Sequence, residues 1–162
     1  MDPITRHSIS RAAEEAVVLW ALASAQYPER HQLILNAAQV AAVETISSFA
    51  LNARRAMEVL TGQKRFRLNA PRWQWAPTVG GEIVCDLRDG LNRIIHAQAL
   101  EIGFTALPKN VAVIDGGAVV VPYIRAATDR RQLAFIDPFA LAHAFLYQAL
   151  PVLENTQHEH IQ

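Results

Sequence analysis

The apolar positions of the first hundred residues recur at the spacing of a helix, and they predict three helices. The first covers residues 8 to 26, where serines at the start can cap it and a proline follows its end. The second covers residues 29 to 60 and stops before a glycine. The third covers residues 81 to 103. Residues 8 to 103 are therefore predicted to form a helical bundle.

After Pro108 the apolar period changes from 3.6 to 2, which predicts strands rather than helices. Residues 109 to 136 are predicted to form a three-stranded antiparallel meander, with tight turns at DGG (115 to 117) and TDRR (128 to 131). Pro122 lies inside the middle strand. Because proline cannot donate a hydrogen bond to the ladder, we expect a bulge or a strand end there.

The last apolar segment, residues 137 to 151, has the features of a closing helix. Asp137 can cap its first turn and Pro151 is expected to end it. The tail, residues 152 to 162, is polar and expected to be flexible. The chain is thus predicted to be a single domain over residues 1 to 162, mainly α, in which a helical bundle carries a small C-terminal β-meander and a closing helix.

Composition bears on the cellular compartment of this protein and on the charge of its binding partners. Of its 162 residues 51% are hydrophobic and 19% charged, and 15 basic residues balance 15 acidic ones, so no overall charge steers it to nucleic acid or membrane. The only cysteine, Cys85, excludes an intramolecular disulfide. The N-terminus lacks the pattern of a secretory signal, and the longest apolar run is too short to span a bilayer. We expect a cytoplasmic protein without membrane association.

The stretch RDGLNRIIHA, residues 88 to 97, carries the best candidate for chemistry. On a helix, Arg88, Asn92 and His96 form one stripe, because they are four residues apart. A neighbouring apolar stripe would face the core, so the imidazole would lie at the edge of the buried surface. Such an imidazole suits general acid–base catalysis near neutral pH, and a nearby guanidinium could hold a phosphate. The alternative is a hydrogen-bonded residue at the edge of a packed helix.

The string LRDGLNRIIHA resembles the signature helix of small bacterial HEPN proteins (higher eukaryotes and prokaryotes nucleotide-binding domains). The resemblance implies a helical bundle that pairs into a homodimer. It also implies RNA cleavage without a metal or another cofactor, through an arginine, a polar residue after it and a histidine. Members of this family act in toxin–antitoxin or antiphage systems, so the resemblance places this chain in such a context.

Within that motif, His96 matches the family histidine and Asn92 matches the polar residue. The family arginine should then stand at position 91, where this chain has Leu91. Either Arg88 or Arg93 takes its place, or the helix is a HEPN-like scaffold without activity. The resemblance covers residues 8 to 103 and leaves the C-terminal meander unexplained.

A second stretch, between residues 54 and 75, is the most basic part of a neutral chain and interleaves basic with aromatic residues. Such a pattern suits single-stranded nucleic acid, because cations contact the backbone while rings stack on bases. The alternative is that the tryptophans are buried in the core while the arginines are solvated. The candidate RNA-binding residues are Arg54, Arg55, Lys64, Arg65, Arg67, Arg72, Trp73 and Trp75. The arginines of the TDRR turn are assigned to solvent or to a partner contact.

Two functions follow from these patterns. In the first, the protein is a HEPN-like ribonuclease or RNA-binding protein, and His96 acts on a 2′-hydroxyl or a leaving oxygen while Arg88 and Arg93 hold the phosphate. In the second, it is a non-catalytic module on the same scaffold, such as an antitoxin, an inhibitor or a subunit of an assembly. Leu91, the zero net charge and an exposed strand edge favour the second function.

Overall fold

Helices and strands are interspersed along the chain in the computed structural model, which describes all residues except 61, 63, 78, 79 and 160 to 162. A short 3₁₀ turn, Met57–Val59, follows the second helix, and a π-helical turn, Phe145–Ala149, follows the fourth. The helices are α1 (Pro3–Ser24), α2 (Gln32–Ala56), α3 (Leu87–Ile95), α4 (Pro138–Ala144) and α5 (Leu150–Glu159). The strands are β1 (Tyr27–Pro28), β2 (Glu82–Ile83), β3 (Ala99–Ala106), β4 (Ala118–Ala127) and β5 (Ala134–Ile136).

These strands form one mixed, five-stranded sheet, so the fold is α/β. Strand β4 is central, with β3 antiparallel along one edge and both β1 and β5 antiparallel along the other. Strand β2 adds to β5 in parallel. The prediction of a mainly α bundle with a three-stranded antiparallel meander was therefore wrong. The first strand of the sheet, residues 27 and 28, is far in sequence from the predicted meander. It joins the sheet by pairing with β4, which local sequence patterns do not predict.

The largest single error was the predicted helix over residues 81 to 103. Only α3 in its middle is helical, and the segments on either side join the sheet as β2 and β3. The apolar residues Leu100, Ile102 and Phe104 alternate, as a half-buried strand requires. The first meander strand was instead expected around Val113, which is 81% exposed and lies in the loop before β4. Short apolar runs fit both periods, and pairing with β4 selects the strand.

The expected irregularity at Pro122 is confirmed. Gly103 pairs with Tyr123 and Thr105 pairs with Val120, so two residues of β4, including Pro122, lie opposite one residue of β3. A bulge suits proline, because the extra residue is not required to donate a hydrogen bond to the neighbouring strand. The predicted turn at residues 128 to 131 is confirmed as the connection between β4 and β5.

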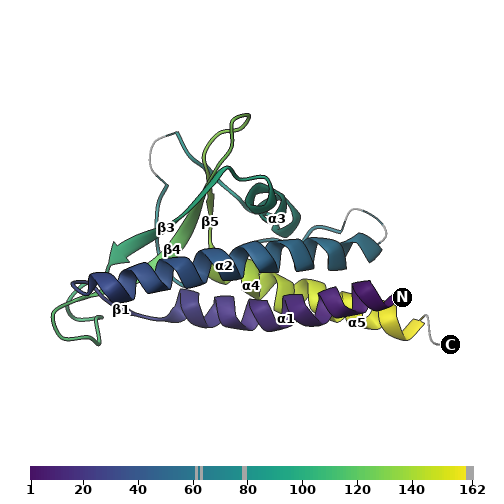
Figure 1. Ribbon diagram of the computed structural model, residues 1–162, viewed down its shortest axis with the longest axis horizontal. Coiled ribbons are helices and arrows are strands. Elements are labelled where there is room, and N and C mark those ends of the chain that lie inside the picture. Colours follow the sequence, from purple (N-terminus) through teal and green to yellow (C-terminus); the bar gives the residue numbers. More distant parts are fainter. Residues whose placement is uncertain (61, 63, 78–79, 160–162) are drawn as a thin grey trace.

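Below the sheet in Figure 1, α1 and α2 run antiparallel and side by side. Their contact is lined by alanines and by Leu19, Ile46 and Phe49, which are fully buried. One buried carboxylate, that of Glu15, crosses the contact and accepts hydrogen bonds from Ser48 and from Asn52 at 3.1 Å. A buried carboxylate with several donors is stable, because each bond replaces one lost to water.

The helix α2 with the turn after it, Gln32–Val59, is the one described segment long and apolar enough to cross a membrane by length and composition alone. One such helix does not by itself identify a membrane protein, and 28% of its apolar window is buried inside this structure. In the structure α2 packs against α1, α3 and β3, and it buries a row of alanines. This arrangement is that of a small soluble-type domain.

The closing helix begins as expected but continues further. Asp137 caps α4 by accepting the backbone N–H of Ala140 at 2.9 Å, and Pro138 occupies the first turn. Pro151 does not end the helix. It falls in the first turn of α5, directly after the π-helical turn, where a missing N–H costs little. Helix α5 extends to Glu159, so the tail from residue 152 is helical over most of its length, and residues 160 to 162 lie outside the described part.

The Asp137 cap generates a prediction about stability and pH. Burial is the main cause that raises the pKa of Asp137 above its ordinary value of 3.8, against the hydrogen bonds from Ala140 and Trp75 that lower it. A raised pKa means that stability present below pH 3.8 is lost as the pH rises through the folded-state pKa. Asp137→Asn keeps a capping oxygen and does not ionise. We therefore expect its free energy of unfolding to increase relative to that of wild type as the pH rises through the folded-state pKa of Asp137.

The matched variant Asp137→Ala removes the cap and should lower the free energy of unfolding by about 1 kcal/mol. Urea unfolding of both variants and wild type between pH 3 and pH 8 checks this prediction. A stability difference between Asp137→Asn and wild type that does not change with pH would contradict it.

Candidate functional site

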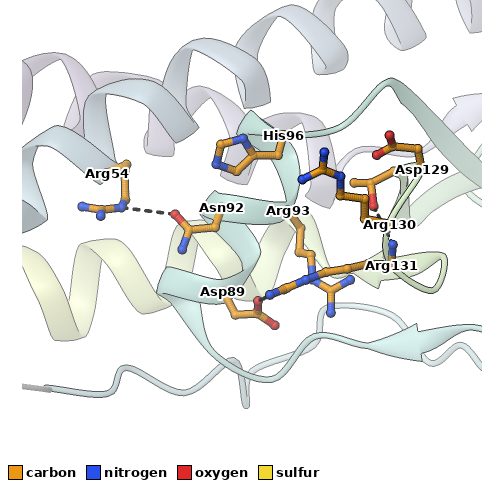
Figure 2. A pocket seen from close by; sticks show the side chains of 9 residues that line it. Arg54, Asp89, Asn92, Arg93, His96, Asp129, Arg130 and Arg131 are labelled. Carbon is orange, nitrogen blue, oxygen red and sulfur yellow. Dashed lines mark hydrogen bonds and ion pairs between the residues drawn. The ribbon is translucent and has the colours of Figure 1, made fainter.

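An open cleft of about 660 Å³ lies where the C-terminal half of α3 meets α2 and the turn between β4 and β5 (Figure 2). The α3 helix begins at the Asp86 cap, which accepts the N–H of Asp89 at 3.1 Å, and ends at His96. Residues from three separate parts of the sequence thus share one cleft. They are Arg54 of α2, Asp89, Asn92, Arg93 and His96 of α3, and Thr128, Asp129, Arg130 and Arg131 of the turn.

The wall on the α2 side is made by Arg54. Its Nε donates to the Oδ1 atom of Asn92 at 3.2 Å, and its Nη1 contacts Glu58 at 3.3 Å, one helical turn away. The Arg54 side chain is 30% exposed, so part of the guanidinium remains accessible from the cleft. The Asn92 contact orients this group, which reduces the entropy that a ligand would have to remove.

The floor of the cleft is a structural ion-pair cluster around Arg93. This side chain is 7% exposed and contacts Glu82 of β2 at 2.5 Å and Asp89 at 3.4 Å. Its Nη1 also donates to the backbone oxygen of Gln132 at 3.4 Å. With these partners, Arg93 holds α3 to β2 and to the chain before β5, and the two carboxylates offset its charge.

The opposite wall is the turn that carries Arg130 and Arg131. Thr128 stiffens it by accepting the N–H of Arg131 at 3.1 Å. Arg131 reaches Asp89 at 3.6 Å, with a side chain that is 60% exposed. Figure 2 shows the Arg130 guanidinium directed toward His96 and the Arg131 side chain extended toward Asp89.

Basic side chains outnumber acidic ones in the lining of this cleft, although the whole chain is neutral. Four arginines and a histidine line it against two aspartates. Arg54, Arg93 and Arg131 each contact a carboxylate, whereas Arg130 makes none of the ion pairs found among the described residues. Guanidinium groups bind phosphate and carboxylate with several parallel hydrogen bonds, so the cleft suits an anion. In the described part of the chain, no group of three His, Cys, Asp or Glu side chains could hold a metal ion.

The structure places the predicted stripe of α3 only partly in this cleft. Asn92 and His96 line it, and His96 is exposed at the helix end. Arg88 points elsewhere: its Nη2 donates to the backbone oxygen of Met57 at 3.4 Å, so it caps the C-terminal end of α2. Arg88 is therefore not among the residues that line the cleft, whereas Arg93, Arg54 and Arg130 share it with His96.

Position 91, where the resemblance places an arginine, belongs to the core. Leu91 is fully buried and packs within the main hydrophobic cluster. The preceding residue, Gly90, is close to Leu141, and a Cβ at Gly90 would lie 2.9 Å from the Cδ1 atom of Leu141. This face of α3 is packed against α4 and cannot present a guanidinium to a ligand.

The basic and aromatic segment does not converge on one site. Only Arg54 of that set lines the cleft. Arg55, Lys64, Arg65 and Arg67 are exposed, and Arg72 lies over the Trp73 ring at 4.9 Å. Trp73 donates to the backbone oxygen of Ala23 at 2.7 Å and Trp75 donates to Asp137 at 3.3 Å. The half-buried tryptophans anchor the segment to the body of the protein, but they are not buried in the core as the alternative interpretation predicted.

Two arginines of the cleft, Arg130 and Arg131, were not predicted as site residues from the sequence. They were assigned to solvent or a partner because they stand in a turn. Their charge signal was visible in the string TDRR, but only the pairing of β4 with β5 brings that turn over the end of α3.

Comparison of the chain with protein-family models, with curated proteins and with solved structures finds no match.

The burial of Leu91 generates a prediction about the missing arginine. Leu91→Arg would place a charge among apolar side chains, and we expect it to lower the free energy of unfolding by more than about 4 kcal/mol. Leu91→Met conserves volume and should cost less than about 1.5 kcal/mol. Urea unfolding followed by circular dichroism measures both. A stable Leu91→Arg protein would show that α3 can turn this position outward.

Proposed function

We propose that the protein binds single-stranded RNA through the cleft between α2, α3 and the β4–β5 turn. The observation that carries this proposal is the convergence of Arg54, Arg130 and Arg131, from two elements, around the exposed end of α3. Arginines on opposite walls suit a chain of phosphates that enters between them. Much of the affinity for a nucleic acid comes from such backbone contacts, and it depends on salt because counterions are released.

We further propose that His96 acts as general acid or base on RNA held in this cleft. Asn92 lies one turn before it on α3, and the Arg130 guanidinium points toward it (Figure 2). A neutral imidazole could take a proton from a 2′-hydroxyl while a guanidinium stabilises the charge on the phosphate. In this proposal Arg54 and Arg130 replace the predicted Arg88 and Arg93. The resemblance of residues 88 to 97 to HEPN proteins, with its defence or toxin–antitoxin context and its homodimer, stays a prediction.

A protein-binding role is the second candidate, and one observation favours it. Leu33, Val40 and Leu51 lie on one line of α2 and are 74%, 56% and 59% exposed. A row of exposed apolar side chains on a helix is typical of a surface that another helix covers. It fits a second copy of this chain, an antitoxin or an assembly subunit. The exposed, free Cys85 is consistent with a reducing compartment, and we infer the cytoplasm.

Removal of the two turn arginines tests RNA binding. We expect Arg130→Ala/Arg131→Ala to weaken binding of a labelled single-stranded RNA about tenfold or more, and to lower the salt slope of log K by about 2, because two phosphate contacts are lost. Fluorescence anisotropy from 50 to 300 mM NaCl measures both quantities. The control Lys64→Ala/Arg65→Ala/Arg67→Ala removes three exposed cations outside the cleft. If this control weakens binding and the cleft variant does not, RNA binds elsewhere.

The catalytic step has its own test. We expect wild type to cleave mixed cellular RNA in the presence of EDTA and His96→Ala to lose at least about 100-fold in rate, the usual contribution of general acid–base catalysis. Because His96 is exposed, the variant should melt at the wild-type temperature. RNA binding without cleavage by wild type would leave a binding protein, and neither binding nor cleavage would favour the protein-partner role.

A further inference from the structure

A second cleft, of about 490 Å³, lies on the other side of β2. Glu82 of β2 points to Arg93 in the first cleft, and the next residue, Ile83, lines the second, as alternation along a strand requires. Its walls are apolar and aromatic. They include Leu68, Pro71, Trp73, Trp75 and Ile83, and the carboxylate of Asp137 lies among them.

The two indole rings of this cleft are held in place. The Trp73 Nε1 donates to the backbone oxygen of Ala23, at the end of α1, and the Trp75 Nε1 donates to the Oδ2 atom of Asp137. Trp75 also packs on Tyr123 and Phe135, with ring centroids 5.1 and 6.1 Å away. The rings therefore need little reordering to receive a ligand, which favours binding.

Of the described residues that line the second cleft, Asp137 alone has a charged side chain, and it is 8% exposed. Its oxygens accept the Ala140 N–H and the Trp75 N–H, which are both neutral donors. Among the described residues, no lysine, arginine or histidine lies within 4.0 Å of this carboxylate. Buried carboxylates are normally paired with a cation, and burial raises the pKa of this one. A positive charge bound in the cleft would give this carboxylate a charged partner in addition to its neutral donors.

We propose that this cleft binds a small organic cation, with an alkylated ammonium or guanidinium group between the tryptophan rings and the carboxylate of Asp137. Aromatic faces and a carboxylate are the two kinds of surface that attract such a group. In this chain Arg72 already lies 4.9 Å over the Trp73 ring, so the ring accepts a guanidinium.

The geometry of the acceptors favours a cation over a neutral ring with two adjacent N–H donors, such as a guanine edge. Such an edge needs both carboxylate oxygens in a fixed direction, and each oxygen of Asp137 already accepts a bond. A diffuse positive charge needs no such alignment. This inference is independent of RNA binding, because the two clefts share no lining residue.

A fluorescence titration tests the proposal. The chain has three tryptophans, so Trp20→Phe leaves only Trp73 and Trp75 as reporters. In this background we expect choline or methylguanidinium to change the emission saturably, and 3,3-dimethylbutanol, the neutral isostere of choline, to have little effect. Asp137→Asn keeps an oxygen for the helix cap but replaces the oxygen that accepts from Trp75 with an NH2 group, and it should weaken cation binding about tenfold or more, as expected from loss of a buried charge interaction.

Two further variants separate the contributions. Trp73→Leu removes one ring and should also weaken binding, whereas Arg72→Ala removes a nearby competing cation and should leave binding equal or tighter. The proposal is overturned if neither cation binds up to about 100 mM, a limit far weaker than the affinities of specific ligands. It is also overturned if the neutral isostere binds as well as the cations, or if Asp137→Asn binds like the parent. None of these three results would bear on RNA binding at the first cleft.

Discussion

The buried guanidinium of Arg93 is the interaction on which the functional end of this protein depends. It joins three segments at once: its own helix through Asp89, strand β2 through Glu82, and the chain before β5 through the Gln132 carbonyl. A buried charge is stable only with such partners, because it has lost its hydration. Since β2 has only two residues in the sheet, this cluster gives it an attachment that its two ladder positions alone would not provide.

That cluster also determines how charge is distributed over the surface. Asp89 neutralises Arg93 and contacts Arg131, so the negative groups of α3 are drawn to the floor of the first cleft. Arg54, held by Asn92, and Arg130 remain on the walls. A neutral chain thereby has a cleft with more basic than acidic side chains in its lining. The interactions that stabilise α3 are the same ones that leave its exposed end suited to an anion.

Strand β2 divides two clefts of opposite character. On one side, arginines and His96 surround a polar space; on the other, Trp73 and Trp75 surround one buried carboxylate. The long segment before β2 is anchored by these two tryptophans, through Ala23 and Asp137. The aromatic residues that the sequence pattern assigned to stacking on RNA bases are therefore used to attach a loop, and the space that they enclose favours a cation.

By itself the sequence determined the local features: the two long N-terminal helices to within five residues at each end, the Asp137 cap, the bulge at Pro122 and the turn at residues 128 to 131. Each depends on neighbours within a few positions, so spacing and residue type suffice. It also singled out Asn92 and His96. Only the tertiary structure decided that residues 82 to 83 and 99 to 106 are strands, that Leu91 is core, and that Arg130 lies near His96. These outcomes depend on pairing between segments distant in sequence, and no periodicity within one segment contains that information.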